Sequence, residues 1–155
     1  MKSNNLTDHT LIIDELERSI KIHNWNSILP FLPKGSYLVG GYIRDIVLKR
    51  VNEKIDVDIV VPSNAIKIGK MISENIKSKF IILDKEREVV RIILNHISID
   101  IANQISSTIE GDLKSRDFSI NSIAFLFGTG KAPGKPMQVG HKLMFGSSVS
   151  TTAHL

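Results

Sequence analysis

Apolar and polar residues alternate strictly in two stretches of this chain. Between residues 55 and 59 branched apolar residues alternate with Asp56 and Asp58, and between residues 97 and 101 isoleucines alternate with Ser98 and Asp100. Successive side chains of a strand point to opposite faces, so each stretch collects its apolar residues on one face. The pattern predicts two strands that are buried on one face and carry carboxylates on the other.

Shorter apolar runs predict three more strands, at residues 37–39, 80–83 and 89–94. The connection Asn95-His96 is short enough to join the last of these to the strand that begins at Ile97. We therefore expect a hairpin at this point.

Helical spacing of apolar residues predicts one helix after Gly41 and a longer one after Pro62-Ser63. The apolar stripe of the longer helix is predicted to comprise Ile66, Ile68, Met71, Ile72 and Ile76. Its solvated face is predicted to carry Lys67, Lys70, Lys77 and Lys79.

The order of these elements predicts an α/β (α+β) fold in which helices flank a mixed β-sheet. Residues 1–35 are expected to form an N-terminal helical segment, and residues 36–127 the main domain. Near the end of that domain a polar approach leads into a helix-like run, with Phe118 and Ile123 facing inward. Residues 128–155 hold half of the ten glycines and no acidic residue, which predicts a loop-rich or disordered tail.

Composition narrows the function classes only slightly. The 155 residues carry a net charge of +4, and because the basic residues are spread along the chain, RNA is permitted as a partner but not required. Cysteine is absent, which excludes disulfides and thiolate zinc sites. Charged residues interrupt the apolar pattern of the N-terminus, so we expect no signal peptide, no membrane partner and a cytoplasmic location.

Asp56 and Asp58 are the first candidates for chemistry. Two carboxylates side by side on an exposed strand face repel each other unless a cation neutralises them, and Mg²⁺ prefers such oxygen ligands together with substrate phosphates. Asp100 points away from the core on a strand that could lie beside them, so it is the candidate third ligand of a two-metal site. The alternative for all three acids is a solvated strand face.

Gly40 and Gly41 join the strand at residues 37–39 to the helix that follows. Glycine permits a sharp turn and a close approach of backbone N–H groups to an anion, and the start of a helix adds a positive potential. A glycine turn followed by two carboxylates thus predicts a phosphate cradle next to a metal site, which is the equipment of nucleotidyl transfer. The alternative is a tight connection in which Arg44 and Asp45 are surface charges.

Three ordered segments strengthen the first interpretation: LVGGYIRD at residues 38–45, DVD at 56–58 and DLKSRDFSINSIAF at 112–125. Together they resemble the catalytic head of the tRNA nucleotidyltransferase and bacterial poly(A) polymerase family, in the DNA polymerase beta-like superfamily. The reaction of that family is attack of an RNA 3′-hydroxyl on the α-phosphate of ATP or CTP. The expected partners are therefore ATP or CTP and an RNA 3′ end, above all that of tRNA.

The resemblance also implies roles for particular residues. It implies that Gly40 and Gly41 contact the triphosphate, that Asp56 and Asp58 hold Mg²⁺, and that Arg44 and Asp45 organise the turn on the phosphate side. The residues that it implies for binding the incoming ribonucleotide are Asp112, Arg116, Asp117 and Asn121.

Two departures from the family pattern leave two hypotheses open. Ser115 replaces the first arginine of the RRD motif, and the loss of such a cationic donor costs about 1.5–3 kcal/mol of binding. The likeness ends near Phe127, whereas the family continues into domains that select the base and grip tRNA. The chain is thus either a nucleotidyltransferase, completed where needed by a second protein chain, or a truncated, non-catalytic nucleotide- or RNA-binding remnant.

Overall fold

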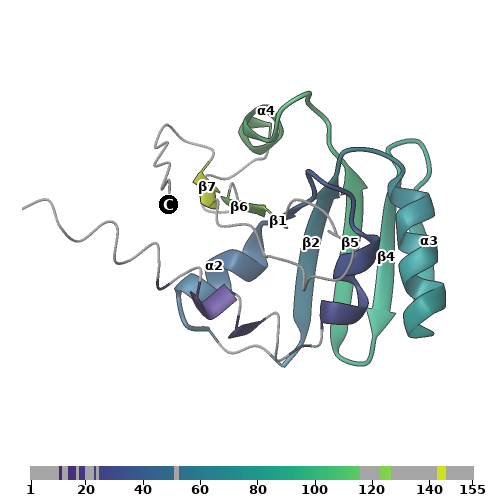
Figure 1. Cartoon of the computed structure of the whole chain (residues 1–155), viewed down its shortest axis with the longest axis horizontal. Helices are drawn as coiled ribbons and strands as arrows, with labels where there is room; N and C mark the ends of the chain where they lie inside the picture. Colours follow the sequence, from purple (N-terminus) through teal and green to yellow (C-terminus); the bar gives the residue numbers. More distant parts are fainter. Residues whose placement is uncertain are drawn as a thin grey trace, which may run out of the picture.

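The chain folds into a mixed β-sheet with helices packed on it (Figure 1). The computed structural model describes residues 11, 14–16, 18–19, 23, 25–50, 53–115, 123–126 and 143–145. The elements in these ranges are η1 (Trp25–Ser27), η2 (Leu29–Phe31), β1 (Tyr37–Val39), α2 (Gly41–Val47), β2 (Ile55–Val61), α3 (Ala65–Ile76), β3 (Lys79–Asp84), β4 (Val89–Leu94), β5 (Ile97–Asn103), α4 (Ile109–Lys114), β6 (Ile123–Leu126) and β7 (Leu143–Phe145).

The strands among the described residues have the order β3-β4-β5-β2-β1-β6-β7. Strands β2 and β5 run parallel, and the other neighbouring pairs are antiparallel. The parallel pair is reached by a crossover through α3, β3 and β4, and β4 and β5 form the hairpin expected at Asn95-His96. The predicted fold class, a mixed sheet flanked by helices, is confirmed.

One face of the sheet is buried beneath the helices. Ile59 of β2 and Ile101 of β5 lie in register on that face and are almost completely buried. The same core contains Val57, Val61, Val90, Ile92, Ile99, Leu38, Ile43, Ile68 and Ile72. The alternation predicted for the two amphipathic strands is therefore confirmed, and their polar residues occupy the opposite face.

Helix α3 packs its small residues on the sheet. Its buried residues are Ala65, Ile68, Gly69, Ile72 and Ser73. A Cβ at Gly69 would lie 2.5 Å from Cγ2 of Val90, so this glycine lets helix and strand approach closely. Met71 is 44% exposed, and its predicted place in the apolar stripe is wrong because Gly69 and Ser73 face the sheet and turn Met71 outward.

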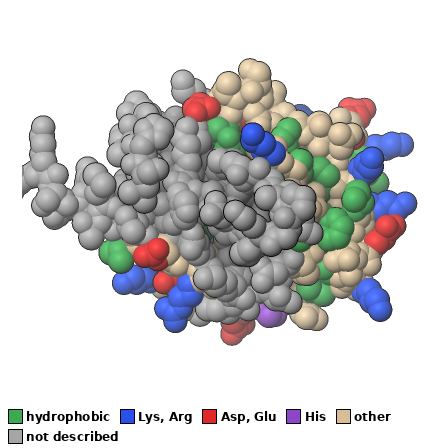
Figure 2. Space-filling model, in the orientation of Figure 1, with side chains coloured by type: hydrophobic (Ala, Val, Ile, Leu, Met, Phe, Trp, Pro, Cys, Tyr) green, Lys and Arg blue, Asp and Glu red, His purple; other side chains and the backbone are tan. Residues whose placement is uncertain are grey.

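The four lysines predicted on the solvated side of α3 and just beyond it are exposed. In Figure 2, lysine and arginine side chains line the edge of the molecule where α3 lies in Figure 1. No described helix is both long and apolar enough to cross a bilayer.

The described part of the N-terminal segment shares the core of the main domain. Leu16 and Trp25 are almost fully buried in it. The Trp25 ring lies 6.2 Å from the ring of Tyr42, centroid to centroid, and the Tyr42 and Ser19 hydroxyls are 2.5 Å apart. These contacts fix α2 against the N-terminal segment, while the boundary set between residues 35 and 36 stays a prediction.

The described residues near the C-terminus extend the sheet. Ile123 begins strand β6, which pairs with β1, so its predicted place in a helix-like run is wrong. Strand β7 lies within the stretch predicted as a loop-rich tail and pairs with β6. Phe118 lies outside the described residues, as do residues 127–142 and 146–155.

Candidate active site

The D-x-D pair, Asp56 and Asp58, lies on the face of β2 opposite the core. Asp56 is exposed and Asp58 partly buried, whereas Val57 and Ile59 between and beyond them are buried. The strand period places both carboxylates on one side of the sheet, as predicted. The open face therefore presents two adjacent acids on a rigid strand in the middle of the sheet.

Gly40 brings the backbone directly against Asp58. The register of β1 with β2 pairs Val39 with Asp58, and Gly40 follows at once. Its φ is +79° and ψ −144°, a conformation open essentially to glycine alone. A Cβ at Gly40 would lie 3.0 Å from Oδ2 of Asp58. Gly40 thus provides both the sharp turn and the space beside the carboxylate.

A cavity of about 570 Å³ opens between α2 and β2. Its walls include five of the predicted site residues, namely Gly41, Arg44, Asp45, Asp56 and Asp58. Basic residues that the sequence interpretation did not single out also line it, namely Lys49, Arg50 and Lys54. Their clustering just before the D-x-D strand was the signal that could have found them. The cavity therefore combines carboxylates with cations, as a metal-bound triphosphate requires.

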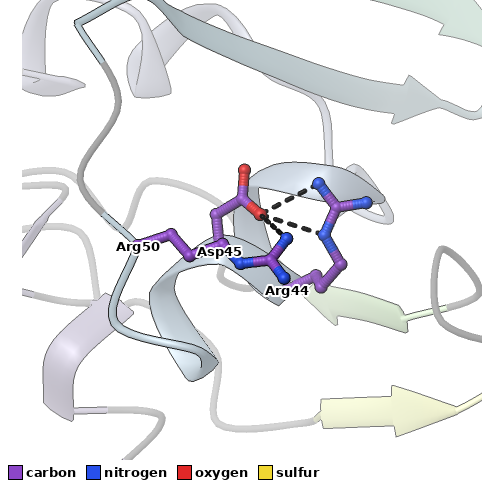
Figure 3. A network of polar contacts seen from close by, with 3 residues as sticks. All are labelled: Arg44, Asp45 and Arg50. Atoms are coloured by element: carbon purple, nitrogen blue, oxygen red, sulfur yellow. Dashed lines mark hydrogen bonds and ion pairs between the residues drawn. The ribbon is translucent and has the colours of Figure 1, made fainter.

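Arg44 and Asp45 form a network with Arg50 at the end of α2 (Figure 3). Nε and Nη2 of Arg44 are each 2.9 Å from Oδ1 of Asp45, and Nη1 of Arg50 is 3.9 Å from the same oxygen. One carboxylate thus holds two guanidinium groups at the cavity wall. This arrangement fits the predicted organising role of Arg44 and Asp45, which stays a prediction.

Asp100 lies beside the D-x-D pair, in register with Asp58 across the parallel strands. Its carboxylate accepts hydrogen bonds from Nε and Nη2 of Arg91, both at 2.7 Å. This contact with Asp100, more than the fields of Asp56 and Asp58, raises the pKa of Arg91. Among the described residues, no three acidic or histidine side chains gather closely enough to hold a metal ion. The role of Asp100 as a metal ligand stays a prediction.

Asp112 is fully buried and does not line the cavity. Its Oδ1 accepts a hydrogen bond of 2.9 Å from the backbone N–H of Ile105. Ser115, which replaces the family arginine, donates from its hydroxyl to the carbonyl of Asp112 at 2.6 Å, at the end of α4. In this structure Asp112 ties α4 to the loop after β5. Arg116, Asp117 and Asn121 lie outside the described residues.

Residues 36–105 match the family model of the Poly A polymerase head domain. This match covers β1 to β5, including the glycine turn and the D-x-D strand. Taken with the likeness to curated relatives and to solved structures, it supports a nucleotidyltransferase head domain in this part of the chain, similar to the heads of tRNA nucleotidyltransferases and poly(A) polymerases.

The individual proteins that the chain resembles are named as tRNA nucleotidyltransferases or CCA-adding enzymes. The chain is 41% identical over 99 residues to the CC-adding tRNA nucleotidyltransferase of Synechocystis sp., covering 64% of this chain and 24% of the relative. It resembles a CCA-adding enzyme solved with ATP (TM-score 0.61, 30% identity, 76% of this chain and 29% of the other). It also resembles the Thermotoga maritima CCA-adding enzyme complexed with tRNA (TM-score 0.56, 36% identity). That match covers 68% of this chain and 26% of the other. The chain thus spans about a quarter of the length of these proteins.

Proposed function

We propose that this head domain transfers a nucleotide from ATP or CTP to an RNA 3′ end, in the manner of CCA-end or poly(A) synthesis. The observation that carries the proposal is the D-x-D pair at a cavity whose other wall is the glycine turn and Arg44. The names of the relatives support the substrate class, because they act on tRNA and one was solved with ATP. The preserved arrangement of Gly40, Asp56 and Asp58 favours an enzyme over a non-catalytic remnant.

The donors at this site fit Mg²⁺. Asp56 and Asp58 offer carboxylate oxygens on one rigid face, and the absent side chain of Gly40 leaves room beside Asp58. Bound by these two residues, Mg²⁺ would neutralise the carboxylates and phosphate oxygens and offset the charge that develops on the departing pyrophosphate. Asp100 remains the predicted third ligand.

The residues of the chain contribute positioning and charge. The backbone at Gly40 and Gly41 lets the triphosphate approach closely, and Arg44, oriented by Asp45, supplies a fixed cation at the same wall. The remaining basic residues of the cavity attract the polyphosphate. No side-chain nucleophile is needed, because the attacking group is the RNA 3′-hydroxyl and catalysis rests on alignment of the reactants. We further propose that the incoming ribonucleotide is contacted by Arg116, Asp117 and Asn121.

The test is extension of tRNA that lacks its 3′ CCA by the purified chain with Mg²⁺ and labelled ATP or CTP. We expect extension by the parent and none by the Asp56→Ala/Asp58→Ala variant, with both proteins equally folded by circular dichroism. Equal extension by both would refute the metal assignment. Mg²⁺-dependent nucleotide binding without extension would support the remnant, or a second protein chain that supplies base selection and RNA grip. Adding the missing domains in trans would separate these two cases.

A further inference from the structure

A row of charged residues crosses three strands on the open face of the sheet. Arg91 of β4 pairs with Asp100 of β5, and Asp100 pairs with Asp58 of β2. The residues on either side of each, such as Val90 and Ile92, point into the core. Arg91 is therefore on the same surface as the D-x-D pair and two strands away from it. It is not among the site residues predicted from the sequence.

The contact between Arg91 and Asp100 fixes the guanidinium while leaving part of it available. Nε and Nη2 of Arg91 bind the two oxygens of Asp100 side-on, a bidentate geometry that is both strong and directional. The pair does not use the N–H groups of Nη1. The Arg91 side chain is 40% exposed and that of Asp100 is 23% exposed. The arginine can thus receive a second anion without releasing the first.

The position of Arg91 suggests which anion this is. Gly40 and α2 lie on the β1 side of Asp58, where the cavity wall that we assign to the triphosphate is found. Arg91 lies on the opposite, β5–β4 side of the same carboxylate. A polynucleotide that brings its 3′ end to the D-x-D pair must pass acids that repel its phosphates, and a fixed cation next to them lowers that repulsion.

We propose that Arg91, oriented by Asp100, binds a backbone phosphate of the acceptor RNA next to its 3′ end. Asp100 is then a positioning residue for Arg91, because it holds the guanidinium in place. This inference rests on the proposed function, since it assumes that the acceptor strand ends at Asp56 and Asp58. It assigns the two sides of the D-x-D strand to different substrates, the nucleotide on the β1 side and the RNA on the β5 side.

The first experiment measures binding by the full chain and needs no turnover. The probes are a labelled RNA hairpin with a single-stranded 3′ end, titrated at several salt concentrations, and Mn²⁺ with ATP. For Arg91→Gln we expect the RNA Kd to rise about five- to tenfold and the salt slope to fall by about one, with Mn²⁺–ATP binding unchanged. Arg87→Gln is the matched control, because Arg87 is an 85% exposed arginine in the β3–β4 turn. It should change the RNA Kd less than twofold.

The second experiment separates the two roles of Asp100. If Asp100 orients Arg91, Asp100→Asn weakens RNA binding about two- to fivefold despite the added positive charge. If Asp100 acts only as a metal ligand, Mn²⁺ affinity falls while RNA affinity stays as in the parent, and the proposal is overturned. Tighter RNA binding by Asp100→Asn also overturns it, because the effect would then be one of net charge. Arg91→Lys, which keeps the charge but not the bidentate contact, should retain part of the RNA affinity.

The outcomes distinguish this inference from the proposed function. A parent chain that binds Mn²⁺–ATP but not the RNA hairpin overturns the Arg91 assignment and leaves the nucleotide site standing. A parent chain that binds RNA through Arg91 but neither binds nor transfers a nucleotide overturns the proposed function instead. Unfolding midpoints within about 2 °C of the parent show that a variant is folded.

Discussion

The two faces of the central strands β2 and β5 share one backbone but differ in the burial and the chemistry of their side chains. On the helix-covered face Ile59, Ile99 and Ile101 are almost completely buried, whereas one residue away Asp58 and Asp100 lie on the open face. Burial of a branched apolar side chain contributes about 1.5–3 kcal/mol to stability, while a partly exposed acid contributes little. Around Asp58 and Asp100, stability and chemistry are therefore assigned to alternate residues, and substitutions of these residues on the two faces should have separable effects.

The largest effect is expected on the buried face. Ile101→Ala removes a fully buried side chain at the centre of the core, and the lost burial and the resulting cavity should lower the free energy of unfolding by about 2–5 kcal/mol. Urea denaturation measures this change. Nucleotide affinity per folded molecule should stay as in the parent, and a loss of affinity at full folding would show that the faces are coupled.

An intermediate effect is expected at Gly40, where backbone and carboxylate meet. Gly40→Ala puts a Cβ 3.0 Å from Oδ2 of Asp58 at a φ of +79°, so we expect a loss of about 1–3 kcal/mol in stability and weaker Mn²⁺–ATP binding. Gly35→Ala is the matched control, because Gly35 has a φ of +84° and lies against Pro62, outside the cavity. Both variants should lose stability, but only Gly40→Ala should lose binding.

A smaller effect on stability is expected on the open face. Asp56→Asn changes an exposed side chain, so the free energy of unfolding should change by no more than about 0.5 kcal/mol. Mn²⁺ affinity, measured by isothermal titration, should fall about tenfold or more. Glu86→Gln, in the exposed β3–β4 turn, removes the same charge and should leave Mn²⁺ binding intact. Similar losses in both variants would mean that Mn²⁺ senses only net charge.

The smallest effect is expected from His23, at the rim of the cavity. Burial, and to a lesser extent the charge of His96, lowers the pKa of His23. The neutral form is thus favoured in the folded state, and the stability that it contributes is present above about pH 6.5 and lost as the pH falls through the lowered pKa. Urea denaturation at pH 7.5 and 5.5 should show a smaller acid-induced loss for His23→Gln than for the parent. An equal loss of stability in both proteins would show that the titration of His23 does not contribute to the pH dependence.

The elements that alternation or local turns define were predictable from the sequence. The D-x-D strand and its two faces follow from the period of two. The two-residue connection of the β4–β5 hairpin sets Leu94 opposite Ile97 and hence Arg91 opposite Asp100. Counting back along this hairpin would have identified Arg91, although the search for carboxylates alone passed over it.

Features that depend on packing between distant elements were not predictable in this way. The orientation of α3 is decided by Gly69, which fits against Val90, and an apolar stripe alone placed Met71 on the wrong side. The apolar run that begins at Ile123 is too short for its periodicity to separate strand from helix, and pairing with β1 decides for the strand. The basic residues Lys49, Arg50 and Lys54 line the cavity only because the fold brings α2 and β2 together.

The tight β4–β5 connection also bears on how the site is built during folding. Arg91 and Asp100 meet within one hairpin, whereas α3, β3 and β4 separate Asp58 from Asp100 along the chain. Contacts close in the chain form early because they cost little loop entropy, and parallel pairing across a crossover comes later. We therefore expect the half of the site assigned to RNA to exist before the metal-binding strand docks beside it.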